Sequence, residues 1–265
     1  MKIKRISVNK FAAYDEIGIC RGQCVIRRRD LSRVYPDRPI QYEIVVSCDE
    51  DSRDLLWSAA LTRARVVAAE EPLPSRVFTV LSPNDGETGE LLTALGMKTD
   101  DGIVRYKKRV TGEKIYLPVP EGCAIRRDFL GKEDEMRKCL TRYNETFARE
   151  EKRDWLEEIA SRPDFARILM VSPEELCGEA LLWRSGSTGI IGVLQTVPKW
   201  RRQGVASYLM EDARKYFESI GVTNMAVDVR LSAPGNRALA RKSGFSAGDT
   251  LTVYPYIDVK SCTTG

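Results

Sequence analysis

The sequence contains no histidine among its 265 residues. Without an imidazole, the chain cannot build a Ser-His-Asp or Cys-His catalytic centre, a histidine-ligated zinc site or a histidine general base. Proton transfer must therefore use carboxylates, tyrosines, cysteines or ordered water. The seven cysteines are odd in number and scattered, and only Cys20 and Cys24 form a C-x3-C pair. We expect reduced, mostly buried thiols and no metal site.

Long apolar runs are also missing. The chain is 43% hydrophobic and 30% charged, with a mean hydropathy of −0.32, which is typical of a soluble globular protein. The longest stretch without a charge, residues 185–198, is interrupted by polar residues and is too short to cross a bilayer. The first residues lack the apolar core of a signal peptide. We therefore expect a cytoplasmic protein without a membrane partner.

The excess of positive charge is small. Lys and Arg number 42 against 38 Asp and Glu, a net charge of +4, which is too weak for a dedicated nucleic-acid binder. Residues 1–40 hold ten basic and four acidic side chains, but no pattern of stacking aromatics accompanies them. A solvated strand face is the favoured interpretation, and a nucleic-acid partner is not expected.

A linker divides the chain. Residues 111–122 carry turn residues at both ends and two prolines, so we expect domains at 1–115 and 121–265. Periodicity in the second half predicts a mixed α/β order. The expected elements are strands near 124–127, 167–171, 178–183, 189–197, 225–229 and 251–257, and helices near 132–150, 154–161, 205–220 and 236–242.

The first half repeats the end of this pattern at an offset of 148. Gly96 then aligns with Gly244 and Leu61 with Leu209, and an expected helix at 54–71 aligns with 202–219. A chance alignment of two unrelated α/β segments is the alternative. The first half has no room for the opening strand and the two helices, so we expect a truncated copy.

The stretch from Leu194 to Met210 combines an apolar strand that ends at Pro198, a loop with Gly204 and Ala206, and a helix. A helix N-terminus presents unpaired N–H groups and partial positive charge, and small residues there let backbone donors surround a phosphate. The alternative is a solvated basic loop before a surface helix.

This stretch resembles motif A of the GNAT superfamily of acyl-CoA-dependent N-acyltransferases, a strand ending V/T-x-P-x-x-R/Q-x-x-G-x-G/A before a helix. Thr196, Pro198, Arg201, Gly204 and Ala206 match it in register, and the order of elements after residue 122 is similar to the GNAT fold. The resemblance implies a two-lobed α/β protein that moves an acetyl group from acetyl-CoA to an amine by direct attack. The acceptor would be a small molecule or a peptide, no metal is implied, and nothing indicates the oligomeric state.

The resemblance also implies which residues bind acetyl-CoA. The strand end would pair with the pantetheine arm, and the loop and first helical turn would hold the pyrophosphate. The expected binding residues are Leu194, Thr196, Val197, Arg201, Arg202, Gln203, Gly204, Val205, Ala206 and Ser207.

The sequence departs from the family at two positions. The asparagine that often opens the family's second motif falls on Ala233, and the tyrosine that often protonates the leaving thiolate falls on Ala240. Asn236 could replace the first, although a turn or N-cap role explains it more simply. Solvent or a tyrosine from elsewhere could replace the second. These departures leave a non-catalytic acyl-CoA sensor or interaction module as the alternative function.

Two glutamates are candidates for the general base. If the hairpin turns symmetrically about residues 186–187, Glu179 pairs with Leu194, beside the expected acetyl group. Glu145 on the first helix of the second half is the other candidate, from the acceptor side. Alternatively, Glu179 is an outward-facing strand residue.

The first half resembles a degenerate GNAT copy. Where the phosphate loop should be, residues 49–54 hold four carboxylates and no glycine, which would repel a pyrophosphate. This half is therefore not the expected CoA site. A degenerate copy before a functional one is similar to mycothiol synthase, but that enzyme's substrate cannot be carried over.

Overall fold

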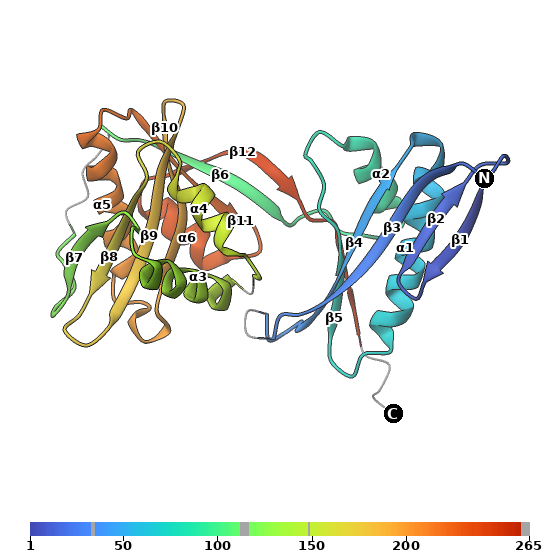
Figure 1. Ribbon diagram of the computed structural model, residues 1–265, viewed down its shortest axis with the longest axis horizontal. Coiled ribbons are helices and arrows are strands. Elements are labelled where there is room, and N and C mark those ends of the chain that lie inside the picture. Colours follow the sequence, from blue (N-terminus) through green and yellow to red (C-terminus); the bar gives the residue numbers. More distant parts are fainter. Residues whose placement is uncertain (33–34, 112–116, 148, 261–265) are drawn as a thin grey trace. The chain divides into compact units, whose positions relative to one another are not determined.

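The computed structural model describes residues 1–32, 35–111, 117–147 and 149–260. The chain divides into two compact units, Met1–Gly102 with Thr250–Gly265, and Ile103–Asp249. Each unit contains a β-sheet with both parallel and antiparallel neighbours and helices packed on it (Figure 1). The expected mixed α/β class is confirmed.

The first unit has a six-stranded sheet in the order β1-β2-β3-β4-β5-β13. Strands β4 and β5 are parallel, and the other neighbours are antiparallel. Helix α1 packs on the sheet with a buried apolar stripe that includes Leu56, Ala60 and Ala64. The elements are β1 (Lys2–Ser7), β2 (Lys10–Tyr14), β3 (Cys20–Asp30), β4 (Ile40–Cys48), α1 (Glu50–Ala69), β5 (Ser75–Phe78), α2 (Gly86–Ala94) and β13 (Tyr256–Val259).

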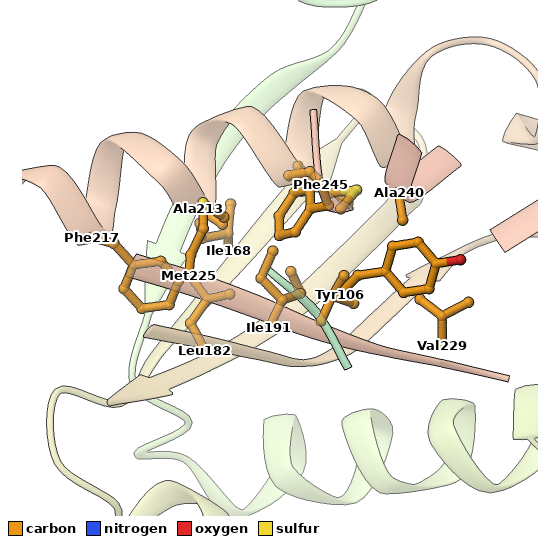
Figure 2. Close-up of a cluster of buried hydrophobic side chains, with 14 of the residues drawn as sticks. Tyr106, Ile168, Leu182, Ile191, Ala213, Phe217, Met225, Val229, Ala240 and Phe245 are labelled. Carbon is orange, nitrogen blue, oxygen red and sulfur yellow. The ribbon is translucent and has the colours of Figure 1, made fainter. Parts of the chain in front are cut away.

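The second unit is built on a sheet in the order β12-β6-β11-β10-β9-β8-β7. Alternation along the strands places Leu182 and Ile191 in the core with α5 and α6 (Figure 2), and Leu181 and Ile190 in the core with α3 and α4. The elements are β6 (Gly102–Arg109), β7 (Ala124–Asp128), α3 (Glu133–Phe147), α4 (Arg153–Ala160), β8 (Ala166–Val171), β9 (Leu176–Ser185), β10 (Thr188–Thr196), the 3-10 helix η1 (Pro198–Trp200), α5 (Val205–Ser219), β11 (Asn224–Arg230), α6 (Pro234–Lys242) and β12 (Ser246–Val253).

Each sheet takes one strand from the other half of the chain. Strand β6, which precedes the linker, pairs with β11, and β13 at the C-terminal end pairs with β5. The compact units therefore differ from the expected ranges 1–115 and 121–265. The single expected strand at 251–257 is wrong: Pro255 separates β12 from β13, because proline cannot donate to a strand ladder.

The internal repeat is visible in the structure. An offset of 148 carries α2 onto α6 and β4 onto β10 with identical bounds. The expected loss of the opening strand is wrong, because β1 is present in the first unit. The two helices alone are missing, since β1 and β2 join through a tight turn at residues 8–9.

The remaining expectations concern the linker and the thiols. Residues 112–116 of the linker lie outside the described residues, and residues 117–123 form neither helix nor strand. The six described cysteines are free, and Cys24, Cys139 and Cys177 are buried; Cys262 lies outside the described residues. Within the described ranges, no helix has the length and apolar character needed to span a membrane.

Candidate functional site

Strands β10 and β11 separate part of the way along their length. They pair in parallel only between Thr188–Ile191 and Asn224–Val227. Beyond this point, β10 continues along β9 and β11 continues along β6. We call the diverging segments, residues 192–196 and 228–230, the fork. Backbone groups of β10 that face the fork are available to an extended ligand, as a missing strand would use them.

A β-bulge begins the fork. The register of β10 against β9 shifts between Ile191 and Val193, which makes Gly192 the extra residue. A side chain at Gly192 would overlap the indole of the buried Trp183. Glycine therefore permits the bulge, and the bulge bends β10 away from β11.

The loop after β10 leads to an uncapped helix end. Gly204 is the N-cap of α5, with φ +84° and no side-chain hydrogen bond to the helix. A Cβ atom at Gly204 would meet nothing within 4 Å. No N-cap side chain therefore covers the N–H groups of the first turn of α5, where the helix carries partial positive charge.

The loop before α5 carries one lysine that is paired with a carboxylate and two arginines that are not. Lys199 is neutralised by Glu175, with Nζ and Oε1 2.8 Å apart, and the Trp200 indole also donates to this carboxylate. Arg201 and Arg202 are exposed and form no ion pair with any described residue. Arg202 also has a left-handed backbone, with φ +65°, which is strained for a residue with a side chain. Two arginines are therefore available to an anion.

The residues expected to bind the cofactor lie along one continuous path. Leu194 and Thr196 are on the β10 side of the fork, and Val197 is held by a hydrogen bond from its N–H to the Cys177 carbonyl at 3.0 Å. Residues 201–204 form the loop, and residues 205–207 form the first turn of α5. Their contacts with a cofactor stay a prediction.

The corresponding place in the first unit has the opposite character. Helix α1 begins at Glu50 directly after Asp49, with Glu50 and Asp51 in its first turn. Strands β4 and β5 also stop pairing after Glu43, but the Thr79 hydroxyl donates to the Ile44 carbonyl at 2.8 Å. The start of α1 is therefore acidic, and a hydrogen bond joins β4 to the residue that follows β5.

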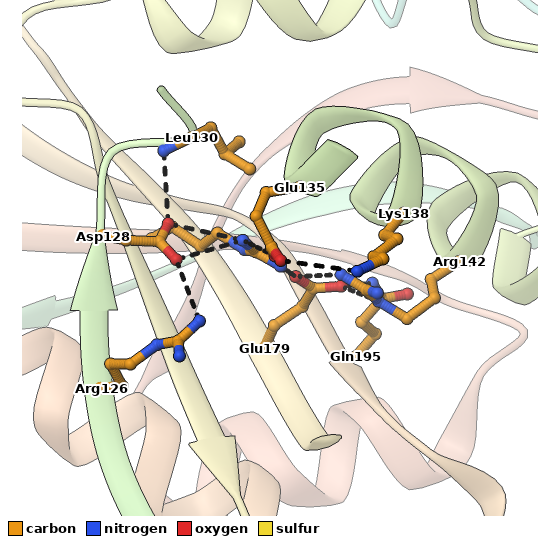
Figure 3. A network of polar contacts seen from close by, with 9 residues as sticks. Arg126, Asp128, Leu130, Glu135, Lys138, Arg142, Glu179 and Gln195 are labelled. Atoms are coloured by element: carbon orange, nitrogen blue, oxygen red, sulfur yellow. Dashed lines mark hydrogen bonds and ion pairs between the residues drawn. The ribbon is translucent and has the colours of Figure 1, made fainter. Parts of the chain in front are cut away.

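Glu179 lies inside a network of charged side chains (Figure 3). It comes from β9 and is fully buried, at 0% exposure. Arg142 of α3 donates to both carboxylate oxygens, at 2.7 and 3.1 Å, and Arg167 of β8 donates to Oε2 at 2.9 Å. The Gln195 amide donates to Oε1. Both oxygens are therefore engaged.

The network extends outward from Arg167. This guanidinium, 1% exposed, also contacts Asp128 at 3.2 Å and Glu135 at 3.1 Å. The hydrogen bond from Arg167 lowers the pKa of Glu135 despite partial burial. Buried and partly buried charges of both signs, together with the Gln195 amide, thus connect β7, β8, β9, β10 and α3.

The expected pairing of Glu179 with Leu194 is wrong by one residue. Glu179 pairs with Gln195, and Leu194 pairs with Ala180. The expected symmetry holds up to Ile191, and the bulge at Gly192 then shifts the rest of β10. Glu179 does not face outward either, because α3 covers it. Glu145 is exposed on α3 and has no ion-pair partner within the described ranges.

The two alanines that depart from the family pattern have different surroundings. Ala240 is 1% exposed in the core under α6, and Ala233 is the N-cap of α6 without a side-chain bond. Asn236 lies inside α6, so its expected N-cap role is wrong: the helix begins at Pro234. Sequence reasoning missed Tyr106, which belongs to the same core as Ala240 (Figure 2). It precedes the linker, and no local signal connects it to β11.

Comparisons with known proteins agree with this geometry. Residues 133–245 match the model of the Acetyltransferase (GNAT) family. A GCN5-related N-acetyltransferase from Sphaerobacter thermophilus is similar in structure, with TM-score 0.57 and 16% identity over 99% of this chain and 85% of that one. A tandem GNAT protein from the clavulanic acid biosynthesis pathway has TM-score 0.51 and 11% identity over 94% of this chain and 82% of that one.

A third similar structure is a probable N-acyltransferase from Enterococcus faecalis, with TM-score 0.59 and 12% identity over 92% of this chain and 61% of that one. No curated protein matches the sequence. The likeness to mycothiol synthase in particular stays a prediction. Residues 133–245 are thus similar to the GNAT acetyltransferase family, and the fold of the chain is similar to that of solved GNAT structures, a tandem GNAT protein among them.

Proposed function

We propose that this protein transfers an acetyl group from acetyl-CoA to a primary amine by direct attack, with one CoA site in the second unit. The observation that carries the proposal is the fork of β10 and β11 next to the uncapped N-terminus of α5. This arrangement offers backbone hydrogen bonds to an extended amide-containing arm and N–H donors to a phosphate group.

Each part of the site has a proposed role. The backbone of Leu194 and Thr196 pairs with the pantetheine arm, as a strand would. The N–H groups of residues 202–207 bind the pyrophosphate, and Arg201 and Arg202 add charge that no described carboxylate neutralises. The Val197 N–H and the side chains of Gln203 and Val205 hold the loop between strand and helix.

The acceptor amine must lose a proton when it attacks. We assign this task to Glu145, directly or through water, because it is exposed on α3. Glu179 is better suited to positioning, since two guanidinium groups and the Gln195 amide engage its oxygens. It fixes the distance of α3 from the strand that would hold the acetyl group.

The test combines binding with turnover. Isothermal calorimetry with acetyl-CoA should give one site per chain, and thiol release should appear with at least one member of a panel of polyamines, aminoglycosides, amino-acid amides and peptides. Binding without thiol release for any amine would favour the non-catalytic acyl-CoA sensor, which the alanine at position 240 motivates. Absence of binding would refute both. A cytoplasmic location without membrane or nucleic-acid partners stays a prediction from composition.

A further inference from the structure

Two thiols lie in contact in the second unit. Cys123 stands between the linker and β7, and Cys177 belongs to β9. Their Sγ atoms are 3.6 Å apart, although the two residues are 54 positions apart in the sequence. The S–S bond of a disulfide is about 2.05 Å long, so the sulfur atoms need to approach by only about 1.5 Å to form one. The pair is therefore a candidate site of oxidation.

The two thiols have different surroundings. Cys177 is fully buried, in the same core as Val205 and Leu209 of α5, whereas Cys123 is half-buried at the edge of that core. Burial raises the pKa of the Cys177 thiol to about 11. The thiolate is the form that reacts with an oxidant. Cys123 is therefore the thiol that meets an oxidant from solution, and Cys177 is the partner behind it.

The backbone around Cys177 is held more firmly than the backbone around Cys123. Cys177 is the extra residue of a β-bulge in β9 against β8, and its carbonyl accepts the Val197 N–H at 3.0 Å. Cys123 lies just outside β7, and its N–H donates to the Pro120 carbonyl at 3.0 Å in a turn at the end of the linker. The approach of the two sulfur atoms can therefore come from Cys123.

The position of Cys123 makes a cross-link there consequential. Strand β7 is an edge strand of the second sheet and pairs with β8. None of its five side chains is fully buried, so few apolar contacts hold it in place. Helix α3, which carries Arg142 and Glu145, follows β7 along the chain. A bond from Cys123 to β9 would fasten the start of this edge strand to the interior of the sheet.

We propose that a peroxide converts Cys123 and Cys177 into a reversible disulfide, which fastens the start of β7 to β9. The Cys123 thiolate attacks one peroxide oxygen, the O–O bond breaks, and a sulfenic acid and water form. The Cys177 thiol then loses its proton, and its sulfur attacks the sulfenic sulfur. The S–S bond forms, the S–O bond breaks, and the hydroxide leaves as water. Two thiols and one hydrogen peroxide thus give one disulfide and two waters, and a thiol reductant reverses the change.

Peptide mapping of the whole protein tests the bond directly. The chain is treated with hydrogen peroxide at about pH 8.5, where more of each thiol is deprotonated, the remaining thiols are alkylated, and the digest is analysed by mass spectrometry with and without dithiothreitol. A peptide pair joined through Cys123 and Cys177 should appear and should separate on reduction. Alkylation of both residues after treatment, or their recovery only as sulfinic and sulfonic acids, would overturn the proposal.

Thermal unfolding measures what the bond does. Closing a loop of this length limits the unfolded chain, so the oxidised protein should have a Tm about 5–10 °C above that of the reduced protein. Cys123→Ser should abolish the difference. Cys20→Ser is the matched control, because Cys20 is an exposed cysteine of the first unit, and it should keep the difference. Loss of the difference in Cys20→Ser, or its persistence in Cys123→Ser, would contradict the assignment.

Hydrogen exchange of the wild type needs no variant and covers the case in which Cys123→Ser does not fold. Amides of β7 should exchange more slowly after oxidation, because the bond suppresses local opening of the edge strand. Amides of β2 in the first unit should exchange at the same rate in both states. Equal exchange of β7 before and after formation of the bond would refute the fastening of β7. Neither measurement involves acetyl-CoA, so the outcome is independent of the proposed function.

Discussion

A single charge at Gly204 tests the proposed phosphate site. Asparagine and aspartate have nearly the same size, and both tolerate the left-handed backbone better than other side chains do. Because an added Cβ meets nothing within 4 Å, and φ is +84°, Gly204→Asn and Gly204→Asp should fold equally well. Both side chains can cap α5, so the pair differs by one negative charge at the helix N-terminus.

The expected effect follows from Coulomb's law. Two unit charges about 4 Å apart repel by about 1 kcal/mol in bulk water and about 4 kcal/mol at the effective dielectric of a protein surface. Gly204 is exposed, so a value of about 1–3 kcal/mol is appropriate for a pyrophosphate at this loop. Since 1.4 kcal/mol corresponds to a tenfold change, the Kd of acetyl-CoA should be about 10- to 100-fold higher for Gly204→Asp than for Gly204→Asn.

Calorimetry at two ionic strengths measures this difference. Salt screens exposed charges, so the ratio of the two Kd values should shrink between low salt and physiological salt. The variants should share the same Tm, which excludes misfolding as the cause. Equal Kd values at low salt, or two acetyl-CoA sites per chain, would refute the placement of the pyrophosphate at Gly204.

Three further predictions concern the proposed base, acid stability and the exchanged strand. Glu179→Gln should lower the free energy of unfolding by about 3 kcal/mol in a denaturation assay, because it leaves two guanidinium groups partly uncompensated. Glu145→Gln should leave Tm unchanged and lower kcat for thiol release by about 10²-fold. If instead Glu179→Gln lowers kcat and Glu145→Gln lowers stability, Glu179 is the base. Arg167 lowers the pKa of Glu135 from 4.5 in the folded state. The contribution of Glu135 to stability is therefore present above about pH 4.5 and is lost as the pH falls through the folded-state pKa. Glu135→Gln should make Tm fall less steeply with acid, and an unchanged slope of Tm against pH would contradict this. A fragment of residues 103–249 should be monomeric and bind acetyl-CoA by calorimetry, while 122–249 should aggregate without β6; a soluble, binding 122–249 would show that β6 is dispensable.

Much of the fold and of the proposed CoA loop could be predicted because the signals are local. The turn at residues 186–187, the proline at 198 and the apolar stripe after Val205 each determine their own element. The offset of 148 correctly predicted the repeat of α2 and α6 for the same reason. Each helix is followed by a left-handed glycine, Gly96 with φ +86° and Gly244 with φ +82°. Such patterns depend on neighbours within a few residues, and these are visible in the sequence.

The register around Glu179 could not be predicted from the same information. The symmetric hairpin is correct next to the turn, but Trp183 packs where a side chain of residue 192 would lie. That contact between two strands produces the bulge, and the bulge moves Gln195 opposite Glu179. The network with Arg142 and Arg167 then forms between residues that no spacing rule connects.

The exchange of strands has the largest consequence for the candidate site. Proline and turn residues correctly indicate a linker at 111–122, but a linker marks a break in local structure and does not determine which sheet each flanking strand joins. Strand β6 lies before the linker and pairs with β11 after it, at more than one hundred residues' separation. The pairing places Tyr106 beside Ala240, where the family resemblance expects a tyrosine. A division of the chain at its linker therefore separates Tyr106 from β11, whereas the folded sheet brings the two together in one core.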